Sequence, residues 1–248
     1  MLIEQCAYSN RWRRFDPAAK GVFACSCLVA AFMAGRPVVL CVMAFVIASI
    51  TVVGAGIRVR DYLRIFLPPL LFLAISSASL ALSVHGYFFP LRFYVQLEQS
   101  QLPHVALACG RSLNSLTALL FLSLTTPVTD LIALLRRLKT PEVLLDIMTL
   151  CYRTLFVFME AVHDTRVAQS ARLGYATNRL ALRSLGGLVA NITVQVWQRS
   201  QALHLAALAR NNDGPLCFLE NEYPNSGRSI LLASVAGCLL LALSRVLS

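Results

Sequence analysis

Two segments of this sequence end in the same pattern, an alanine-rich turn followed by an arginine. The first is Ala168-Gln-Ser-Ala171-Arg172 and the second is Ala206-Ala-Leu-Ala209-Arg210. A guanidinium can form two parallel hydrogen bonds to a carboxylate, and alanine side chains let another backbone approach closely. The pattern therefore indicates two helix ends that could dock on acidic side chains of a partner protein.

The repetition carries this interpretation, because one alanine-rich helix that ends in arginine is most simply an ordinary capped helix. In the second segment, Ala202, Ala206 and Ala209 recur at helical spacing and form a face of small residues. Arg199 and Arg210 are about three helical turns apart, so they lie on the same side of the helix. Such a helix suits a groove on another protein.

The composition is that of a membrane protein. Of the 248 residues, 57% are hydrophobic and 14% are charged, and the mean hydropathy is +0.67. A typical soluble domain carries about 25% charged residues. We therefore expect an all-α integral membrane protein.

Five apolar runs predict about five transmembrane helices, since a crossing takes about 20 residues. The first two are separated only by Gly35-Arg36, so they should form an antiparallel hairpin. We expect a membrane region over 1–127 with about four spans, a cytoplasmic or interfacial helical block over 128–228, and a last transmembrane helix over 229–248. The runs are 18–35, 37–57, 65–84, 105–127 and 229–247.

The basic residues set the expected orientation, because cytoplasmic loops are rich in Lys and Arg. With a cytoplasmic N-terminus, that side holds the basic residues of 11–20, 58–64 and 128–228. The opposite side then holds only three arginines in loops or at span ends. The net charge of +10 is therefore placed as in a protein of the inner or plasma membrane rather than on a nucleic-acid-binding surface. The three arginines are Arg36, Arg92 and Arg245.

The block over 128–228 begins with a short helix between Pro127 and Pro141. Arg136 and Arg137 fall in its last turn, where positive charge is favourable. Its leucines recur at helical spacing and form one apolar stripe, which suits a membrane surface or another helix.

A long helix follows from Glu142, and its few polar residues, including Arg153 and Glu160, fall on one narrow stripe. The stripe either meets a polar stripe on a neighbouring helix or faces solvent, and the sequence leaves both open. Gly174 is predicted to end this helix. Residues 142–162 are apolar enough to be partly embedded in the membrane.

After Gly174 we expect a connector that holds Arg179 and Arg183. A second apolar helix over about 184–198, again apolar enough to be partly embedded, should lead into the alanine-rich helix that ends at Arg210. The following Asn211-Asn-Asp-Gly-Pro run is a stop signal.

Motifs for catalysis, metal binding or ATP hydrolysis are missing from the sequence. It has no Gly-x-x-x-x-Gly-Lys-Ser/Thr loop, no HExxH, and no Cys or His pair at zinc spacing. The predicted spans carry no Asp, Glu or His, and Arg111 is the one charge well inside a span, where it either snorkels outward or makes a structural pair. These features disfavour a membrane enzyme and a stand-alone permease, the two alternatives, and they predict no catalytic residue, metal or cofactor.

At these residues the chain resembles the transmembrane T component of energy-coupling factor (ECF) ABC transporters, specifically the cobalt-type CbiQ family. Asp16-Pro17-Ala-Ala-Lys20 resembles the opening motif of that family. Three further segments resemble its short cytoplasmic helix, its Tyr-Arg…Glu-Ala stretch and its two coupling-helix arginines. They are Leu-Arg136-Arg137-Leu-x-x-Pro141, Tyr152-Arg153-Thr-Leu-Phe-Val-Phe-Met-Glu160-Ala, and the pair Arg172 and Arg210.

The family pattern ends its coupling helices in Ala-Arg-Gly, whereas this chain has Ala-Arg-Leu-Gly and Ala-Arg-Asn. We expect Gly174 to act one position later than usual in the first helix. In the second, Asn211 should accept the left-handed conformation that a helix stop requires.

The resemblance implies a scaffold in a cobalt importer rather than an enzyme. It would join two ATP-binding subunits of CbiO type to a substrate-binding membrane subunit of CbiM type, with or without a small CbiN-type subunit. It implies coupling to the ATPases at Ala171, Arg172, Gly174, Ala209 and Arg210. Residues that would support the coupling helices are Arg136, Arg137, Arg153, Glu160 and Arg199.

Overall fold

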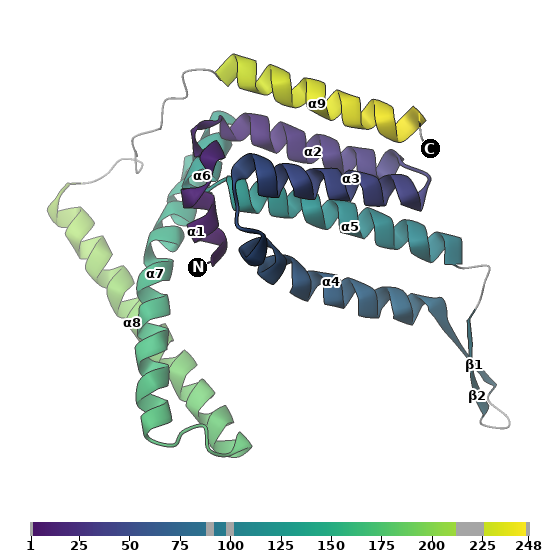
Figure 1. Ribbon diagram of the computed structural model, residues 1–248. Helices are drawn as coiled ribbons and strands as arrows, with labels where there is room; N and C mark the ends of the chain where they lie inside the picture. Colours follow the sequence, from purple (N-terminus) through teal and green to yellow (C-terminus); the bar gives the residue numbers. More distant parts are fainter. Residues whose placement is uncertain (1, 88–91, 98–101, 212–225, 247–248) are drawn as a thin grey trace. The chain divides into compact units, whose positions relative to one another are not determined.

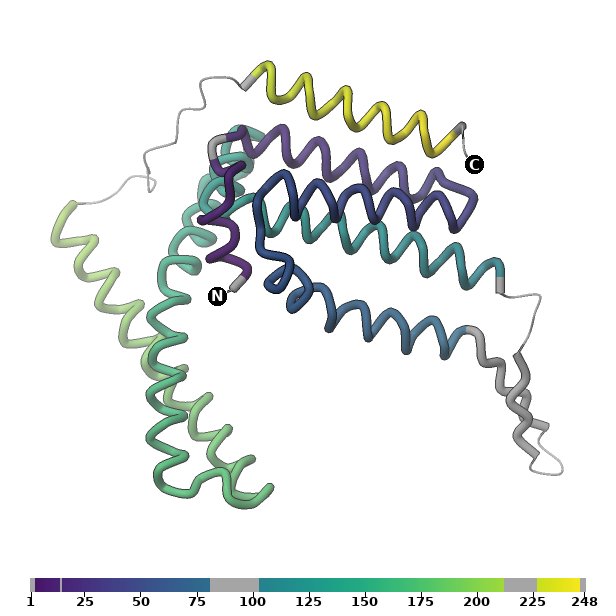
Figure 2. Tube along the Cα trace, in the orientation of Figure 1, coloured from purple at the N-terminus to yellow at the C-terminus, as the bar shows by residue number. Residues whose placement is uncertain are grey.

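The computed structural model describes residues 2–87, 92–97, 102–211 and 226–246 (Figures 1 and 2). These residues form α-helices, a 3-10 turn, a π-helical segment and one β-hairpin. In chain order they are α1 (Leu2–Ser9), the 3-10 turn (Arg11–Arg14), α2 (Pro17–Met33), α3 (Pro37–Ser49), the π-helical segment (Ile50–Gly54), α4 (Val59–Ala81), β1 (Leu82–Tyr87), β2 (Arg92–Leu97), α5 (Leu102–Thr125), α6 (Val128–Arg137), α7 (Glu142–Ala171), α8 (Asn178–Ala209) and α9 (Ser226–Val246).

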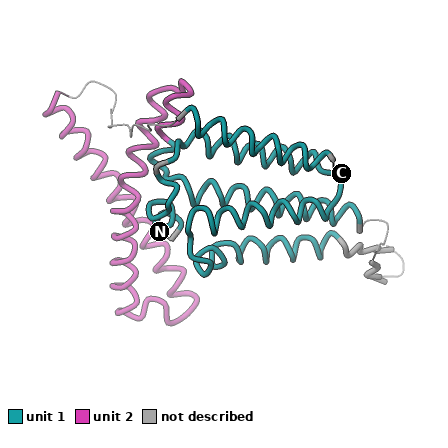
Figure 3. Tube along the Cα trace, turned by 45° about the horizontal axis from the view of Figure 1, so that its top comes forward, with its two compact units in different colours: residues 1–131, 221–248 teal, residues 132–220 magenta. Residues whose placement is uncertain are grey.

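The chain divides into two compact units, shown in different colours in Figure 3. Unit 1 contains residues 1–131 and 221–248, so α9 belongs with the N-terminal helices. Unit 2 contains residues 132–220, with α7 and α8 as its main elements.

Unit 1 is a bundle in which α2, α3, α5 and α9 run alongside one another (Figures 1 and 2). Helix α2 contacts both α5 and α9, and α4 packs on α5. Two glycines permit close approach: a Cβ on Gly110 of α5 would lie 3.1 Å from Leu40 of α3, and a Cβ on Gly237 of α9 would collide with Ser26 of α2. Small residues at such contacts bring helix backbones together in a membrane protein.

Four helices are long and apolar enough to cross a membrane, over Pro37–Gly54, Val59–Leu80, Pro103–Thr125 and Gly227–Arg245. The remaining predicted span, 18–35, corresponds to α2, which has 17 residues and falls short of that length. Neither α7 nor α8, both described throughout, is among these candidates. The predicted α-helical membrane fold is thus confirmed, apart from one short hairpin.

A short β-hairpin connects α4 to α5, which the sequence did not predict. Strands β1 and β2 are antiparallel, with Leu82 opposite Leu97 and Tyr87 opposite Arg92. It is the one departure from helix within the described part of the chain.

Arg111, the charge inside a predicted span, makes a structural contact. Its side chain donates to the carbonyl of Ala34 over 3.4 Å. Ala34 is the C-terminal cap of α2, just before the turn into α3. Because a cation at a helix C-terminus is favourable, Arg111 links α5 to the α2–α3 turn.

The predicted short and long helices are present as α6, which spans the boundary between the two units, and α7. The prediction of a connector followed by separate helices was wrong. Thr177 caps α8, its side chain accepting a hydrogen bond from the backbone N–H of Leu180. The helix then continues without a break from Asn178 to Ala209, so Arg179 and Arg183 lie within it.

Candidate partner-docking site

The α7 helix ends at Arg172 in a complete Schellman cap. Arg172 has φ −94° and ψ 17° and Leu173 has φ +58°. The N–H of Leu173 donates to the carbonyl of Ser170 (3.0 Å), and the N–H of Gly174 donates to that of Gln169 (2.9 Å). These two bonds satisfy carbonyls that the helix end would otherwise leave without partners.

The prediction that Gly174 supplies the stop was wrong in its mechanism. The left-handed residue is Leu173, and Gly174 is needed for space instead. A Cβ at position 174 would lie 2.6 Å from Ser184 Oγ and 2.9 Å from the carbonyl oxygen of Gln169. Gly174 therefore lets the end of α7 close onto the start of α8, where Ser184 Oγ donates to the Gly174 carbonyl over 2.9 Å.

Gln169, inside the first arginine-tipped segment, links the end of α7 to the turn and to α8 through its side-chain amide. Sequence reasoning missed this residue. Its amide nitrogen donates to the carbonyl of Ser184 (2.9 Å), and its amide oxygen accepts from the Tyr175 hydroxyl (2.8 Å). The Gln–Tyr spacing across a glycine turn could have hinted at it, but Ser184 comes near only in the folded hairpin.

The α8 helix ends at Arg210 with the same local geometry. Arg210 has φ −99° and ψ 5°, and Asn211 follows at φ +49°. The N–H of Asn211 donates to the carbonyl of Leu208 over 3.0 Å. Asn211 thus takes the left-handed conformation that the sequence predicted for it. In both helices the arginine is the last residue before the chain turns left-handed.

The two arginines lie at opposite ends of α8. Arg172 precedes its start by a turn of a few residues, and Arg210 follows its last residue. With 32 residues and a rise of 1.5 Å per residue, α8 is about 48 Å long. That length exceeds the roughly 30 Å diameter of a small domain, so one small domain does not reach both arginines.

Both arginine-tipped segments are exposed. The alanines at 168, 171, 206 and 209 are exposed, as are Arg172 and Arg210 themselves. Beside them lie exposed apolar side chains, with Leu173 72% and Leu205 65% exposed. Each end therefore exposes small and apolar side chains next to one arginine cation.

The residues predicted to support the coupling helices are spread over unit 2. Arg136 and Arg137 lie in the last turn of α6 and each has an interaction partner. On α7, Arg153 and Glu160 are exposed, so at these two positions the polar stripe faces outward rather than a second helix. Arg199 is exposed on α8, where it lines a small cavity with Val157 and Phe158 of α7.

A polar junction joins the start of α2, the end of α5 and the start of α6. Lys20 Nζ donates to the Thr125 carbonyl over 2.9 Å, and Asn10 Nδ2 donates to the carbonyls of Leu124 and Thr125 (3.1 and 3.2 Å). Lys20 and Asn10 are buried. They cap the last carbonyls of α5, the transmembrane helix that leads into α6.

Two buried carboxylates balance the Lys20 ammonium in this junction. Asp16 caps α2, its Oδ1 accepting from the N–H of Ala18 (2.9 Å), and Asp130 lies in the first turn of α6. Both carboxylates act on the Lys20 charge. The Asp16-Pro17-Ala-Ala-Lys20 motif thus has a structural role, which its sequence alone did not reveal.

Four membrane-length helices in unit 1 define a multi-pass membrane protein. Comparison with known proteins identifies the family. The profile of the cobalt transport protein CbiQ matches residues 9–218. The chain belongs to the CbiQ family of cobalt transport proteins, the T components of ECF transporters.

Individual relatives agree with this assignment. The chain is 31% identical to the cobalt transport protein CbiQ of Rhodobacter capsulatus over 89% of this chain and 88% of that protein. It is 26% identical to a fused cobalt transport protein CbiMQ of Methanocorpusculum labreanum over 98% of this chain, which spans 41% of the fusion. It is 34% identical to CbiQ of Salmonella typhimurium over 38% of this chain and 41% of that protein.

Proposed function

We propose that this protein is the membrane scaffold of an ATP-driven cobalt importer, with no catalytic site of its own. In this role it joins two CbiO-type ATP-binding subunits to a CbiM-type substrate-binding membrane subunit and transmits the movement of the ATPases to it. The observation that carries the proposal is the pair of matched helix ends at Arg172 and Arg210.

The separation of these ends supports two ATPase contacts rather than one. Because α8 is about 48 Å long and a small domain about 30 Å wide, each arginine meets a different partner. Each guanidinium pairs with carboxylates in a groove of one ATPase, and the alanines beside it let the groove close around the helix. A closing movement of the ATPase pair then shifts both ends of one rigid helical element.

The fused relative supports the contact with the substrate-binding subunit. A protein described as a CbiM–CbiQ fusion keeps both parts on one chain, which suits two membrane subunits that work side by side. In the proposed orientation, the N-terminus and unit 2 lie in the cytoplasm, and the excess of basic residues in these parts supports that orientation.

Photo-crosslinking tests the proposal. A photoreactive amino acid at Ala168 or at Ala206, both exposed beside the arginines, should crosslink to an ATP-binding subunit, and a tagged full-length chain should co-purify that subunit and a second membrane protein. Ala190, exposed in the middle of α8, is the control position and should not crosslink to the ATPase. If Ala168 and Ala206 give no ATPase adduct in a transporting membrane, the proposed role is wrong.

A further inference from the structure

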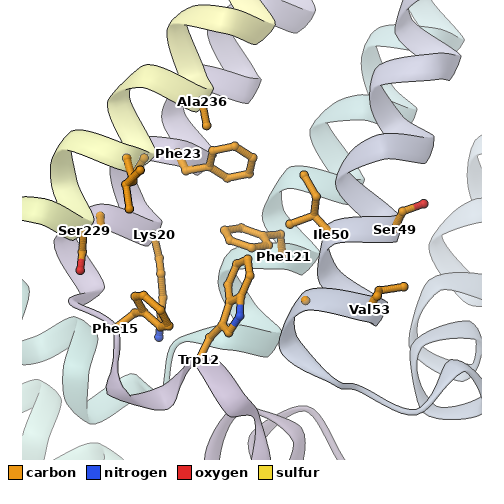
Figure 4. Close-up of a pocket in the computed structure, with 14 residues that line it drawn as sticks. Trp12, Phe15, Lys20, Phe23, Ser49, Ile50, Val53, Phe121, Ser229 and Ala236 are labelled. Carbon is orange, nitrogen blue, oxygen red and sulfur yellow. The ribbon is translucent and has the colours of Figure 1, made fainter.

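An apolar groove opens in unit 1 between α9 and the C-terminal part of α3. It has a volume of about 720 Å³. Figure 4 shows Ser229 and Ala236 on one side, and Ser49, Ile50 and Val53 on the other. Phe23 of α2 and Phe121 of α5 form its floor, in edge-to-face contact with ring centroids 5.1 Å apart.

The groove exists because α3 and α9 diverge along their length. At one end Leu240 and Leu241 of α9 pack against Val39 and Met43 of α3 and close the gap. Toward the other end α3 continues as the π-helical segment Ile50–Gly54. The result is a wedge that is wide beside Trp12 and narrow toward the opposite end of the bundle.

The place of the groove in the membrane decides what fills it. Three of its walls, α3, α5 and α9, are candidate transmembrane helices. Val53 is 77% and Leu232 69% exposed at its rim, so the groove opens sideways from the bundle. An apolar cavity does not hold ordered water, because water needs polar partners. In a bilayer the filling is either an acyl chain or another helix.

The tapering shape of the groove favours the acyl chain. An α-helix with its side chains is about 11 Å across along its whole length, so it does not fit the gap where Leu240 and Leu241 close it against α3. A flexible hydrocarbon chain is slim enough to enter a wedge that narrows along its length.

Charge at the wide end favours an anionic headgroup. Arg228 immediately precedes Ser229 in α9 and is exposed, whereas the Arg13 guanidinium lies over the Tyr8 ring and the Arg11 side chain lies beside Gly56. Trp12 provides an indole at this end, as is common where helices meet the headgroup region. Guanidinium groups bind phosphate in paired geometry.

We propose that this groove binds one anionic phospholipid, with an acyl chain between α3 and α9 and its phosphate beside Arg228 at the wide end. The bound lipid fills the gap that protein packing leaves next to Phe121 and Trp12. It holds α9 against the rest of unit 1 at the end of the bundle that also carries the Lys20 junction.

Quenching of tryptophan fluorescence by brominated lipid tests the proposal, because the chain has two tryptophans and only Trp12 lines the groove. The full-length Trp197→Phe variant is placed in phosphatidylcholine vesicles with increasing dibrominated phosphatidylglycerol or dibrominated phosphatidylcholine. Since one arginine near a membrane surface contributes about 1 kcal/mol toward an anionic lipid, half-maximal quenching should need about fivefold less of the anionic lipid.

Two matched pairs of variants locate the effect. Ala236→Phe fills the groove and should abolish the preferential quenching, whereas Val235→Phe, on an exposed face of the same helix, should keep it. Arg228→Gln should reduce the preference for the anionic lipid about fivefold. Arg245→Gln, at the other end of α9, should leave that preference unchanged. Arg228→Gln does not alter packing, so it remains informative if Ala236→Phe fails to fold.

Three results would each overturn the proposal. Equal quenching by the two lipids would mean that ordinary boundary lipid contacts Trp12. Preferential quenching that survives both Ala236→Phe and Arg228→Gln would place the anionic lipid elsewhere. No quenching by either lipid would mean that protein fills the groove.

Discussion

Lys20 Nζ donates a hydrogen bond to the carbonyl of Thr125 over 2.9 Å, so an ammonium near the start of one bundle helix caps the end of another. Thr125 is the last residue of α5, and Pro127 and Asp130 follow as the chain enters α6. The contact therefore lies where α5 of the transmembrane bundle leads into α6.

Replacing Lys20 by Met should destabilise the bundle by roughly 2–4 kcal/mol, because two buried carboxylates lose their counter-charge. Thr125 keeps a second donor in Asn10, which limits the loss. The measurement is the thermal unfolding midpoint in detergent. Lys139, the other lysine of the chain, is exposed, so Lys139→Met should change the midpoint little. Equal midpoints for the two variants would contradict the role given to Lys20.

Removing the guanidinium at either docking end should weaken ATPase binding without unfolding the protein. For Arg172→Ala and Arg210→Ala we expect losses of roughly 2–4 kcal/mol each, as for a desolvated charged anchor. The double variant should abolish cobalt uptake. Binding is measured by titrating purified ATPase subunits against the full-length chain in detergent or nanodiscs.

Arg166→Ala and Arg179→Ala are the matched controls, since both arginines are exposed on the same helices but neither caps one. They should bind ATPase nearly as well as the wild-type chain. A double variant of Arg172 and Arg210 that still couples ATP hydrolysis to transport at the normal rate would refute the assigned roles.

The sequence predicted those features of the fold that depend on local residue preferences. Proline boundaries, terminal arginines and apolar spacing are local, and they located α6 and α7 to within a few residues. Asn211 was predicted to turn left-handed because that preference belongs to the residue itself. The membrane class followed from composition, which needs no tertiary structure.

Tertiary contacts explain the errors. Gly174 was predicted to be a helix stop, but its lack of a Cβ instead leaves room for Ser184. The sequence does not show that Ser184 lies nearby. The β-hairpin after α4 depends on strand pairing rather than on periodicity. Lys20 and Gln169 act on backbone carbonyls, and a carbonyl carries no sequence signature.

The close contact at Gly174 predicts opposite effects for two glycine substitutions. Gly174→Ala should destabilise the α7–α8 hairpin by about 1–3 kcal/mol, since a Cβ would overlap Ser184 and Gln169. Gly186, in the interior of α8, has open space around it, so Gly186→Ala should stabilise by about 0.5–1 kcal/mol through helix propensity. Hydrogen–deuterium exchange of residues 165–185 reports both changes, and a loss of protection in both variants would contradict the assignment.

The left-handed Leu173 predicts a substitution that stabilises the first docking end. A leucine at φ +58° costs about 1 kcal/mol more than glycine, which accepts this conformation freely. Its side chain is 72% exposed, so little packing is lost in Leu173→Gly. We expect slower exchange of the amides of Leu173 and Gly174 and a rise in local stability of about 1 kcal/mol.

Asn211→Gly should gain less local stability, because asparagine already tolerates the left-handed region. Since neither change touches an arginine, cobalt uptake should be retained in both. If Leu173→Gly exchanges faster, the cap is held by contacts of the leucine side chain rather than by the backbone bonds to Ser170 and Gln169.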